Sequence, residues 1–137
     1  MREIKFKVWS KEEECWISID NIVLDSNGSI AYLVPEADEP PYLEEEVEIM
    51  QYVGLKDVNG KPIYEGDVVN VKWSRYDTEG RNYAIAYDPN NDRYPAFDFV
   101  DWYEDMNGLS CAYIDGQITV IGNIFENHEL LEVRDEL

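Results

Sequence analysis

The sequence predicts a mainly β protein, a small barrel or roll that carries a β-hairpin extension at its N-terminal end. Within residues 50–71, short β-type runs alternate with two glycine turns at 57–60 and 65–67. The glycines supply the positive φ that tight turns require, and the run 68–73 is β-branched and aromatic, as core strands are. Residues 3–9 alternate charged and apolar side chains, which is typical of a half-buried antiparallel strand. With 45% apolar residues, the 137-residue chain is long enough for one packed core.

The first part of the chain predicts two hairpins. A polar reversal at 10–14 separates the opening strand from a partner strand at 15–19. Two further strand candidates, 22–24 and 29–34, flank a turn that has an Asn-Gly pair in the favoured position. The following loop, 35–41, combines three prolines with three acids, so we expect it to be exposed and to hold any internal boundary of the chain.

The remaining strands follow from β-branched and aromatic runs separated by turn residues. Alternation returns at 44–50 and leads into the central stretch, and a polar loop at 74–82 precedes a strand at 83–88. The aromatic segment 94–103 fits a strand or irregular structure, 117–127 is a strand with a bulge or bend at Gly122, and 129–132 can form one helical turn. We expect a single domain, 1–137, with an N-terminal hairpin region and acidic loop at 1–49, a barrel core at 50–127 and a C-terminal tail at 128–137.

The charge balance restricts the partners. The chain carries 30 acidic and 11 basic residues, a formal net charge of −19. Such a chain repels nucleic-acid phosphates and anionic membranes over a Debye length of roughly 8 Å, so we expect neither as a direct partner, and a steered partner should be basic. The acidic run between Glu36 and Glu48 is either a solvated face or a docking strip for a basic partner. The plainer interpretation of the whole excess is solubility.

No arrangement of residues predicts a catalytic site, a cofactor or a metal. His128 has no neighbouring nucleophile or second imidazole, and the scattered glycines form no phosphate-binding motif. Residues 88–92 lack the oxygen pattern of a calcium loop. Cys15 and Cys111 have no metal-ligand spacing, and because the opening residues do not form a signal peptide we expect reduced thiols in the cytosol. No apolar run approaches the roughly 18 residues of a membrane span.

The aromatic segment could serve as a stacking platform for single-stranded nucleic acid. Such platforms work beside Lys and Arg, whereas this segment carries carboxylates, so core packing or a protein interface is the better interpretation. The aromatic residues are Tyr94, Phe97, Phe99, Trp102 and Tyr103, and the carboxylates are Asp98, Asp101, Glu104 and Asp105.

Three segments carry a resemblance to a known family. They are the opening Ile4-Lys5-Phe6-Lys7-Val8-Trp9, the central signature 50–69 with Gly54-Leu55-Lys56-Asp57, Asn59-Gly60-Lys61 and Ile63-Tyr64-Glu65-Gly66-Asp67, and the closing Val120-Ile121-Gly122-Asn123-Ile124-Phe125-Glu126-Asn127. The chain resembles the YopX family, proteins of phages and prophages found largely in Gram-positive bacteria. The resemblance implies an SH3-like barrel or roll and a phage or prophage origin, and it assigns no functional residues. The sequence departs from the family at Val53, Phe125 and His128.

These observations favour a non-enzymatic protein-binding module in the cytoplasm of a bacterial host cell. An SH3-like barrel exposes loops and a shallow aromatic surface, and we expect Tyr52, Tyr64, Trp73 and Tyr94 to frame such a surface. The alternative for each ring taken singly is packing in the core. The alternative is an acidic DNA mimic that occupies the basic groove of a host nucleic-acid-binding enzyme. A third hypothesis, a metal-dependent hydrolase, predicts a cleft with converging carboxylates. Exposed strand edges also make a homo-oligomer compatible with the sequence.

Overall fold

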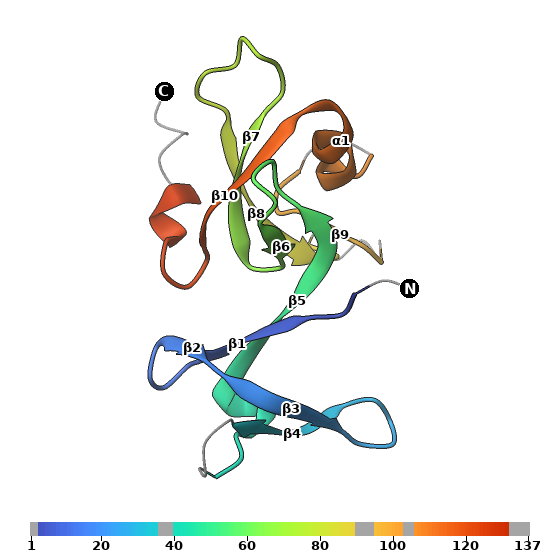
Figure 1. Cartoon of the computed structure of the whole chain (residues 1–137), viewed down its shortest axis with the longest axis vertical. Helices are drawn as coiled ribbons and strands as arrows, with labels where there is room; N and C mark the ends of the chain where they lie inside the picture. Colours follow the sequence, from blue (N-terminus) through green and yellow to red (C-terminus); the bar gives the residue numbers. More distant parts are fainter. Residues whose placement is uncertain (1–2, 36–39, 90–94, 103–105, 132–137) are drawn as a thin grey trace. The chain divides into compact units, whose positions relative to one another are not determined.

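The chain divides into two compact units. The computed structural model describes residues 3–35, 40–89, 95–102 and 106–131. One unit, the hairpin unit, comprises Ile4–Gln51, and the other, the barrel unit, comprises Tyr52–Leu137 with Met1–Glu3. The division falls inside strand β5, Val47–Lys56 (Figure 1). It therefore lies close to the predicted start of the barrel at residue 50 and not in the proline-rich loop, where the sequence analysis expected a boundary.

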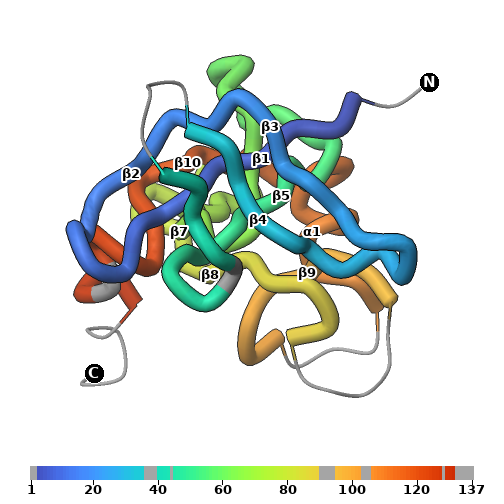
Figure 2. The backbone as a smooth tube through the Cα atoms, turned by 90° about the horizontal axis from the view of Figure 1, so that it is seen from below, coloured from blue at the N-terminus to red at the C-terminus, as the bar shows by residue number. Residues whose placement is uncertain are grey.

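The hairpin unit contains both predicted hairpins. Strand β1, Phe6–Ser10, pairs antiparallel with β2, Cys15–Ile17, and also with the first half of β5. Strands β3, Ile19–Leu24, and β4, Ile30–Pro35, pair with each other and run side by side in Figure 2. The Asn-Gly turn between them has Gly28 at φ +83°, as the turn type requires.

Apolar side chains of the two hairpins meet in a small core. Its buried members are Val8, Leu33 and Val47. Isoleucines from β2, β3, β4 and β5 pack around them while remaining partly exposed. In β1 the predicted alternation does not match the buried side, because Val8, Trp9 and Ser10 are buried in succession, whereas Phe6, on the same face as Val8, is 45% exposed.

The barrel unit is built on a four-stranded antiparallel sheet in the order β10-β7-β8-β9, curled into a half-barrel. The mainly β barrel or roll predicted from the sequence is thus confirmed. Its strands are β7, Asp67–Lys72, β8, Arg81–Tyr87, β9, Phe97–Phe99, and β10, Gln117–Asn123. The second half of β5 pairs with β6, Pro62–Tyr64.

The predicted irregularity at Gly122 is a bulge. Val120 lies opposite Val69, but Gly122 lies opposite Val68, so Ile121 is the extra residue. A Cβ on Gly122 would lie 2.5 Å from Oδ1 of Asn127, which only a shift of that side chain could relieve. The close approach explains why a glycine interrupts an otherwise β-branched strand.

Helix α1, Gly108–Asp115, was not predicted. It buries only Gly108, Leu109 and Ala112, so its sequence lacks the repeating apolar stripe of a surface helix. The local signal is its N-cap, since Oδ1 of Asn107 accepts a hydrogen bond from the Ser110 N–H at 2.8 Å.

Two short 3₁₀ segments complete the elements. The segment η2, His128–Leu131, takes the place of the single helical turn predicted at 129–132. The segment η1, Glu44–Glu46, precedes β5, so the strand predicted from residue 44 begins at Val47 instead. No helix in the described part of the chain is long and apolar enough to cross a membrane.

Asp57 ties the first glycine turn of the barrel unit to its last strand. Its Oδ1 accepts hydrogen bonds from the N–H groups of Asn59 and Lys61, both at 2.9 Å, and its Oδ2 accepts from the N–H of Val120 at 3.0 Å. Burial of the carboxylate raises its pKa, but these hydrogen bonds outweigh burial and hold the pKa of Asp57 below the ordinary 3.8. The signature turn is therefore anchored to the barrel by an ionised side chain.

Candidate functional site

Two of the four residues predicted to frame a surface lie together and are mostly buried. Tyr52 on β5 lies opposite Tyr64 on β6, with ring centroids 5.8 Å apart. Their side chains are 7% and 9% exposed, respectively. They pack between strands and offer little area to a partner. Tyr94, the third of the four, lies outside the described residues.

Trp73, the fourth, follows β7 and belongs to a different group of aromatic rings. Its indole stacks on that of Trp102, with centroids 5.8 Å apart and planes inclined by 28°. Tyr83 on β8 meets Trp102 edge to face at 5.6 Å and stacks on the fully buried Phe99 at 4.5 Å. Trp73, Tyr83 and Trp102 are all half-buried, so the group joins the core to the surface.

These three rings line an open depression of about 640 Å³ in the barrel unit, which we call the aromatic hollow. From the sequence, Trp73 is predicted to frame a surface and Trp102 belongs to a group of core or interface aromatics, whereas Tyr83 is predicted only as part of a strand. No local pattern distinguishes Tyr83, because its position in the hollow depends on the pairing of β8 with β7 and β9. The other lining residues are Arg81, Met106, Cys111 and Asp115.

Helix α1 and the segment before it hold Trp102 in place. The indole Nε1–H of Trp102 donates a hydrogen bond to the backbone oxygen of Met106 at 2.9 Å. A Cβ on Gly108 would lie 2.6 Å from Cδ2 of Trp102, so the helix approaches the ring as closely as a glycine allows. The thiol of Cys111 lies 3.1 Å from Sδ of Met106, which places two polarisable sulfurs at the wall of the hollow.

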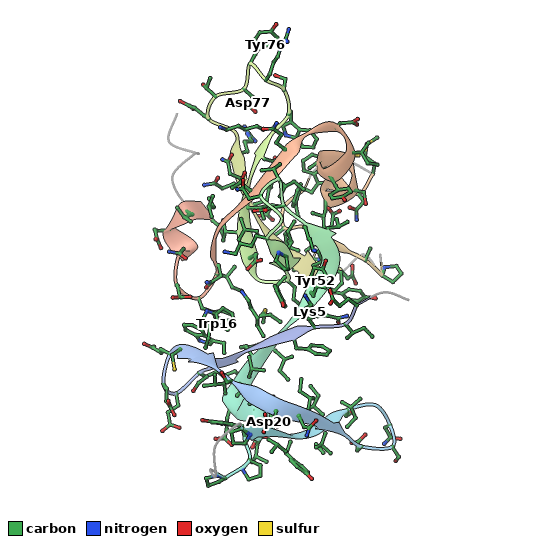
Figure 3. All side chains as sticks on the ribbon, in the orientation of Figure 1. Lys5, Trp16, Asp20, Tyr52, Tyr76 and Asp77 are labelled. Atoms are coloured by element: carbon green, nitrogen blue, oxygen red, sulfur yellow. The ribbon has the colours of Figure 1, made fainter. Side chains whose placement is uncertain are left out.

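The loop between β7 and β8 holds Trp73 from the other side. Asp77 accepts hydrogen bonds from the N–H of Gly80 at 2.8 Å and from the N–H of Trp73 at 3.3 Å. These two hydrogen bonds keep the pKa of Asp77 below its ordinary value, so the carboxylate that braces the loop is ionised. The side chain of Tyr76 is 78% exposed. Figure 3 shows it at the tip of this loop.

The described residues that line the hollow provide aromatic rings, two sulfurs and one charged group of each sign. Among the described residues, no group of three or more His, Cys, Asp or Glu side chains is placed to hold a metal ion. A second depression, of about 590 Å³, lies in the hairpin unit along β1, β2 and β3. There the ammonium of Lys7 lies 5.2 Å from the ring centre of Trp16, so that ring already faces a cation of its own chain (Figure 3 labels Trp16).

Known proteins give a family and a fold, but no activity. A family model described as "YopX protein" matches residues 5–132. The crystal structure of protein EF1440 from Enterococcus faecalis is similar to this chain with a TM-score of 0.65 and 26% sequence identity, over 96% of this chain and 100% of that chain. No curated protein matches the sequence significantly.

Proposed function

The chain belongs to the YopX family, and on that premise we propose that it is a non-enzymatic protein-binding module whose aromatic hollow receives a partner protein. The observation that supports this proposal is the convergence of Trp73, Tyr83 and Trp102 on one open depression. Buried centres of protein interfaces are enriched in aromatic residues and Met, and large rigid rings carry much of the binding energy there.

An exposed apolar side chain in the wall of the hollow adds to this support, and α1 carries two further exposed apolar side chains. Met106 in its wall is 57% exposed, and Ile114 and Tyr113 on α1 are 77% and 51% exposed. Single exposed apolar residues are common, so among these three side chains Met106, which lines the hollow itself, is the one that supports the proposal.

The proposed setting follows the family resemblance. The module would be encoded by a phage or prophage and would act in the cytoplasm of the bacterial host, and its half-barrel would be of the SH3-like type. The strong negative charge, −19, would keep it away from nucleic acid and favour a basic partner protein.

The test is affinity capture from lysates of phage-infected bacteria with the wild type, Met106→Lys and Leu24→Lys. Met106 and Leu24 are each 57% exposed, but Leu24 lies on β3 of the hairpin unit, so the two variants differ in place and not in charge or exposure. We expect the wild type and Leu24→Lys to retain a partner protein that Met106→Lys does not retain. Circular dichroism should show that all three proteins are folded.

Equal retention by both variants would refute the hollow as the binding site. A DNA mimic would instead capture a nucleic-acid-binding enzyme that duplex DNA displaces and that does not depend on Met106.

A further inference from the structure

We propose that the aromatic hollow recognises a cationic side chain, lysine or arginine, carried by a basic segment of the partner. This inference rests on the proposed function and adds the chemistry of the ligand. Aromatic faces attract ammonium and guanidinium groups through the ring quadrupole, most strongly for Trp. Two of the three rings in the hollow are indoles, and both are half-buried, so part of each ring is already shielded from water.

The rings are held in place before any ligand arrives. Trp102 contacts Trp73, Tyr83 and Phe99, each with ring centroids less than 6 Å apart. Its Nε1–H is already hydrogen-bonded to the backbone oxygen of Met106. That donor is therefore already used within the chain, and what Trp102 contributes to the lining of the hollow is its ring. A preorganised ring loses little conformational entropy on binding.

The C-terminal end of α1 adds negative potential to the same depression. Asp115 is the last residue of the helix and lines the hollow. Helix ends of this kind carry partial negative charge, which disfavours an acid and favours a cation. Asp115 is thus an acid at a helix position where the helix dipole favours a basic residue. Its carboxylate and the partial negative charge of the helix end would both attract a positively charged group of a ligand. The net charge of −19 would add longer-range attraction.

The apolar wall suits the stem of such a side chain. Lys and Arg carry aliphatic stems that pack on apolar surface while the charged head reaches a polar group. Met106 and Cys111 supply sulfur and methylene surface on the α1 side of the hollow, and Met106 is a flexible side chain that adapts to different stems. A ligand stem along this wall would direct its charge toward the rings and Asp115.

Among the described residues that line the hollow, Arg81 is the basic one, so replacing it tests the sign of the ligand's charge. It is exposed at the first position of β8. It also lines another depression of the barrel unit, whose lining includes Asp101 and Leu130. Arg81 therefore marks the border between two depressions. If the ligand is a cation, Arg81 weakens binding by repulsion, whereas an anionic ligand would depend on it.

The experiment uses the full-length protein and two synthetic peptides. One contains three lysines spaced by glycine and serine, and the other replaces each lysine by norleucine, which keeps the stem and removes the charge. The indole N–H resonances of Trp73 and Trp102 are followed during the titration by ¹H–¹⁵N NMR. We expect saturable shifts of both resonances with the lysine peptide. The Kd of the norleucine peptide should be higher by about tenfold or more.

Three variants give the direction of the charge effect. Asp115→Asn should raise the Kd of the lysine peptide about threefold or more, and Arg81→Gln should lower it by a similar factor. Asp20→Asn is the matched control, because it makes the same charge change at an exposed position on β3 of the hairpin unit (Figure 3) and should change the Kd by less than about 1.5-fold.

Equal binding of the norleucine peptide, equal effects of Asp115→Asn and Asp20→Asn, or weaker binding by Arg81→Gln would each overturn cation recognition. In those cases, capture of a partner that still depends on Met106 would leave the proposed function standing. Capture that ignores Met106, together with lysine selectivity of the peptides, would overturn the proposed function and leave the cation site.

Discussion

The barrel unit and the hairpin unit bury their apolar side chains to different extents. Among the described residues, the connected core of the barrel unit contains eight buried residues, including Phe99 and Ile63 at 0% exposed. The connected core of the hairpin unit contains three, of which only Leu33 is 0% exposed. A unit of about 50 residues with so small a core is expected to be marginal by itself. The two units should therefore respond differently to the loss of one core side chain.

Buried carboxylates mark the same difference. Asp57, Asp67 and Asp98 are each less than 10% exposed, and all three belong to the barrel unit, where they accept hydrogen bonds from backbone N–H groups. In the described part of the hairpin unit, the buried polar residue is Ser10. Because these hydrogen bonds stabilise the backbone of the barrel unit, aromatic rings at its surface keep fixed positions. A preformed binding site requires such fixed positions.

The largest expected effects come from replacing one buried core side chain of each unit by alanine. Phe99→Ala should destabilise the barrel unit by about 3–5 kcal/mol, because it removes a fully buried ring that packs on Tyr83 and Trp102. Leu33→Ala should cost about 2–5 kcal/mol and, in a core of three buried residues, should unfold the hairpin unit.

Hydrogen exchange of backbone amides separates the two outcomes. After Leu33→Ala, we expect amides of β1 and β4 to lose protection and those of β7 and β10 to keep it. Simultaneous loss of protection in all four strands would mean that the two units fold as one.

Asp57→Ala should destabilise the barrel unit by about 2–3 kcal/mol, because it leaves the Val120 N–H and two turn N–H groups without their acceptor. Asp57→Asn is the matched control, since its amide oxygen can still accept from the turn while its NH₂ group cannot accept from Val120. Urea unfolding followed by tryptophan fluorescence should rank the three proteins as wild type, Asn, Ala. An alanine variant as stable as the asparagine variant would contradict the role of the turn bonds.

Gly108→Ala should cost about 1–3 kcal/mol and displace Trp102, because the added Cβ would lie 2.6 Å from its ring. The indole N–H resonance of Trp102 and its fluorescence should both change. Ser110→Ala, at an exposed position of the same helix, should leave these signals unchanged. A shift of similar size in both variants would point to the helix in general and not to the close approach at Gly108.

Acidification should reveal the lowered pKa of Asp57. Because its pKa in the folded protein lies below the ordinary 3.8, the ionised carboxylate stabilises the fold fully above that value, and this stabilisation is lost as the pH falls through the folded pKa. Below a pH of about 4, wild-type stability should therefore fall more steeply than that of Asp57→Asn. Thermal unfolding of both proteins between pH 6 and about pH 3 measures the difference, and parallel curves would contradict it.

The smallest expected effect is that of Asp115→Asn on stability. Removing an acid from the C-terminal end of α1 should stabilise the barrel unit by about 0.3–1 kcal/mol at low salt. Asp20→Asn on β3 of the hairpin unit should not change the stability of the barrel unit. Destabilisation by Asp115→Asn would show that the carboxylate has a structural role, which would weaken its assignment to ligand binding.

Most strands could be predicted from local pattern, and the reasons are visible in the structure. The alternation at the N-terminus, the Asn-Gly turn at 25–28 and the glycine at the β10 bulge each act through their immediate neighbours. Helix α1 could not be predicted in this way, because only three of its eight residues are buried and its apolar residues form no stripe. The strand expected to start at residue 44 was placed too early, because the three glutamates form a 3₁₀ turn instead.

The sequence by itself determined the family, the mainly β architecture and the positions of most turns and strands, because period-two alternation, β-branched runs and turn glycines depend on residues close together in the chain. Only the tertiary structure decided which aromatic rings are available for contact. Tyr52 and Tyr64 face each other between strands, whereas Trp73, Tyr83 and Trp102 converge from the residue after β7, from β8 and from the segment after β9. Burial of an aromatic ring depends on which distant strands pair beside it, and strand pairing over long sequence separation is not encoded in any single segment.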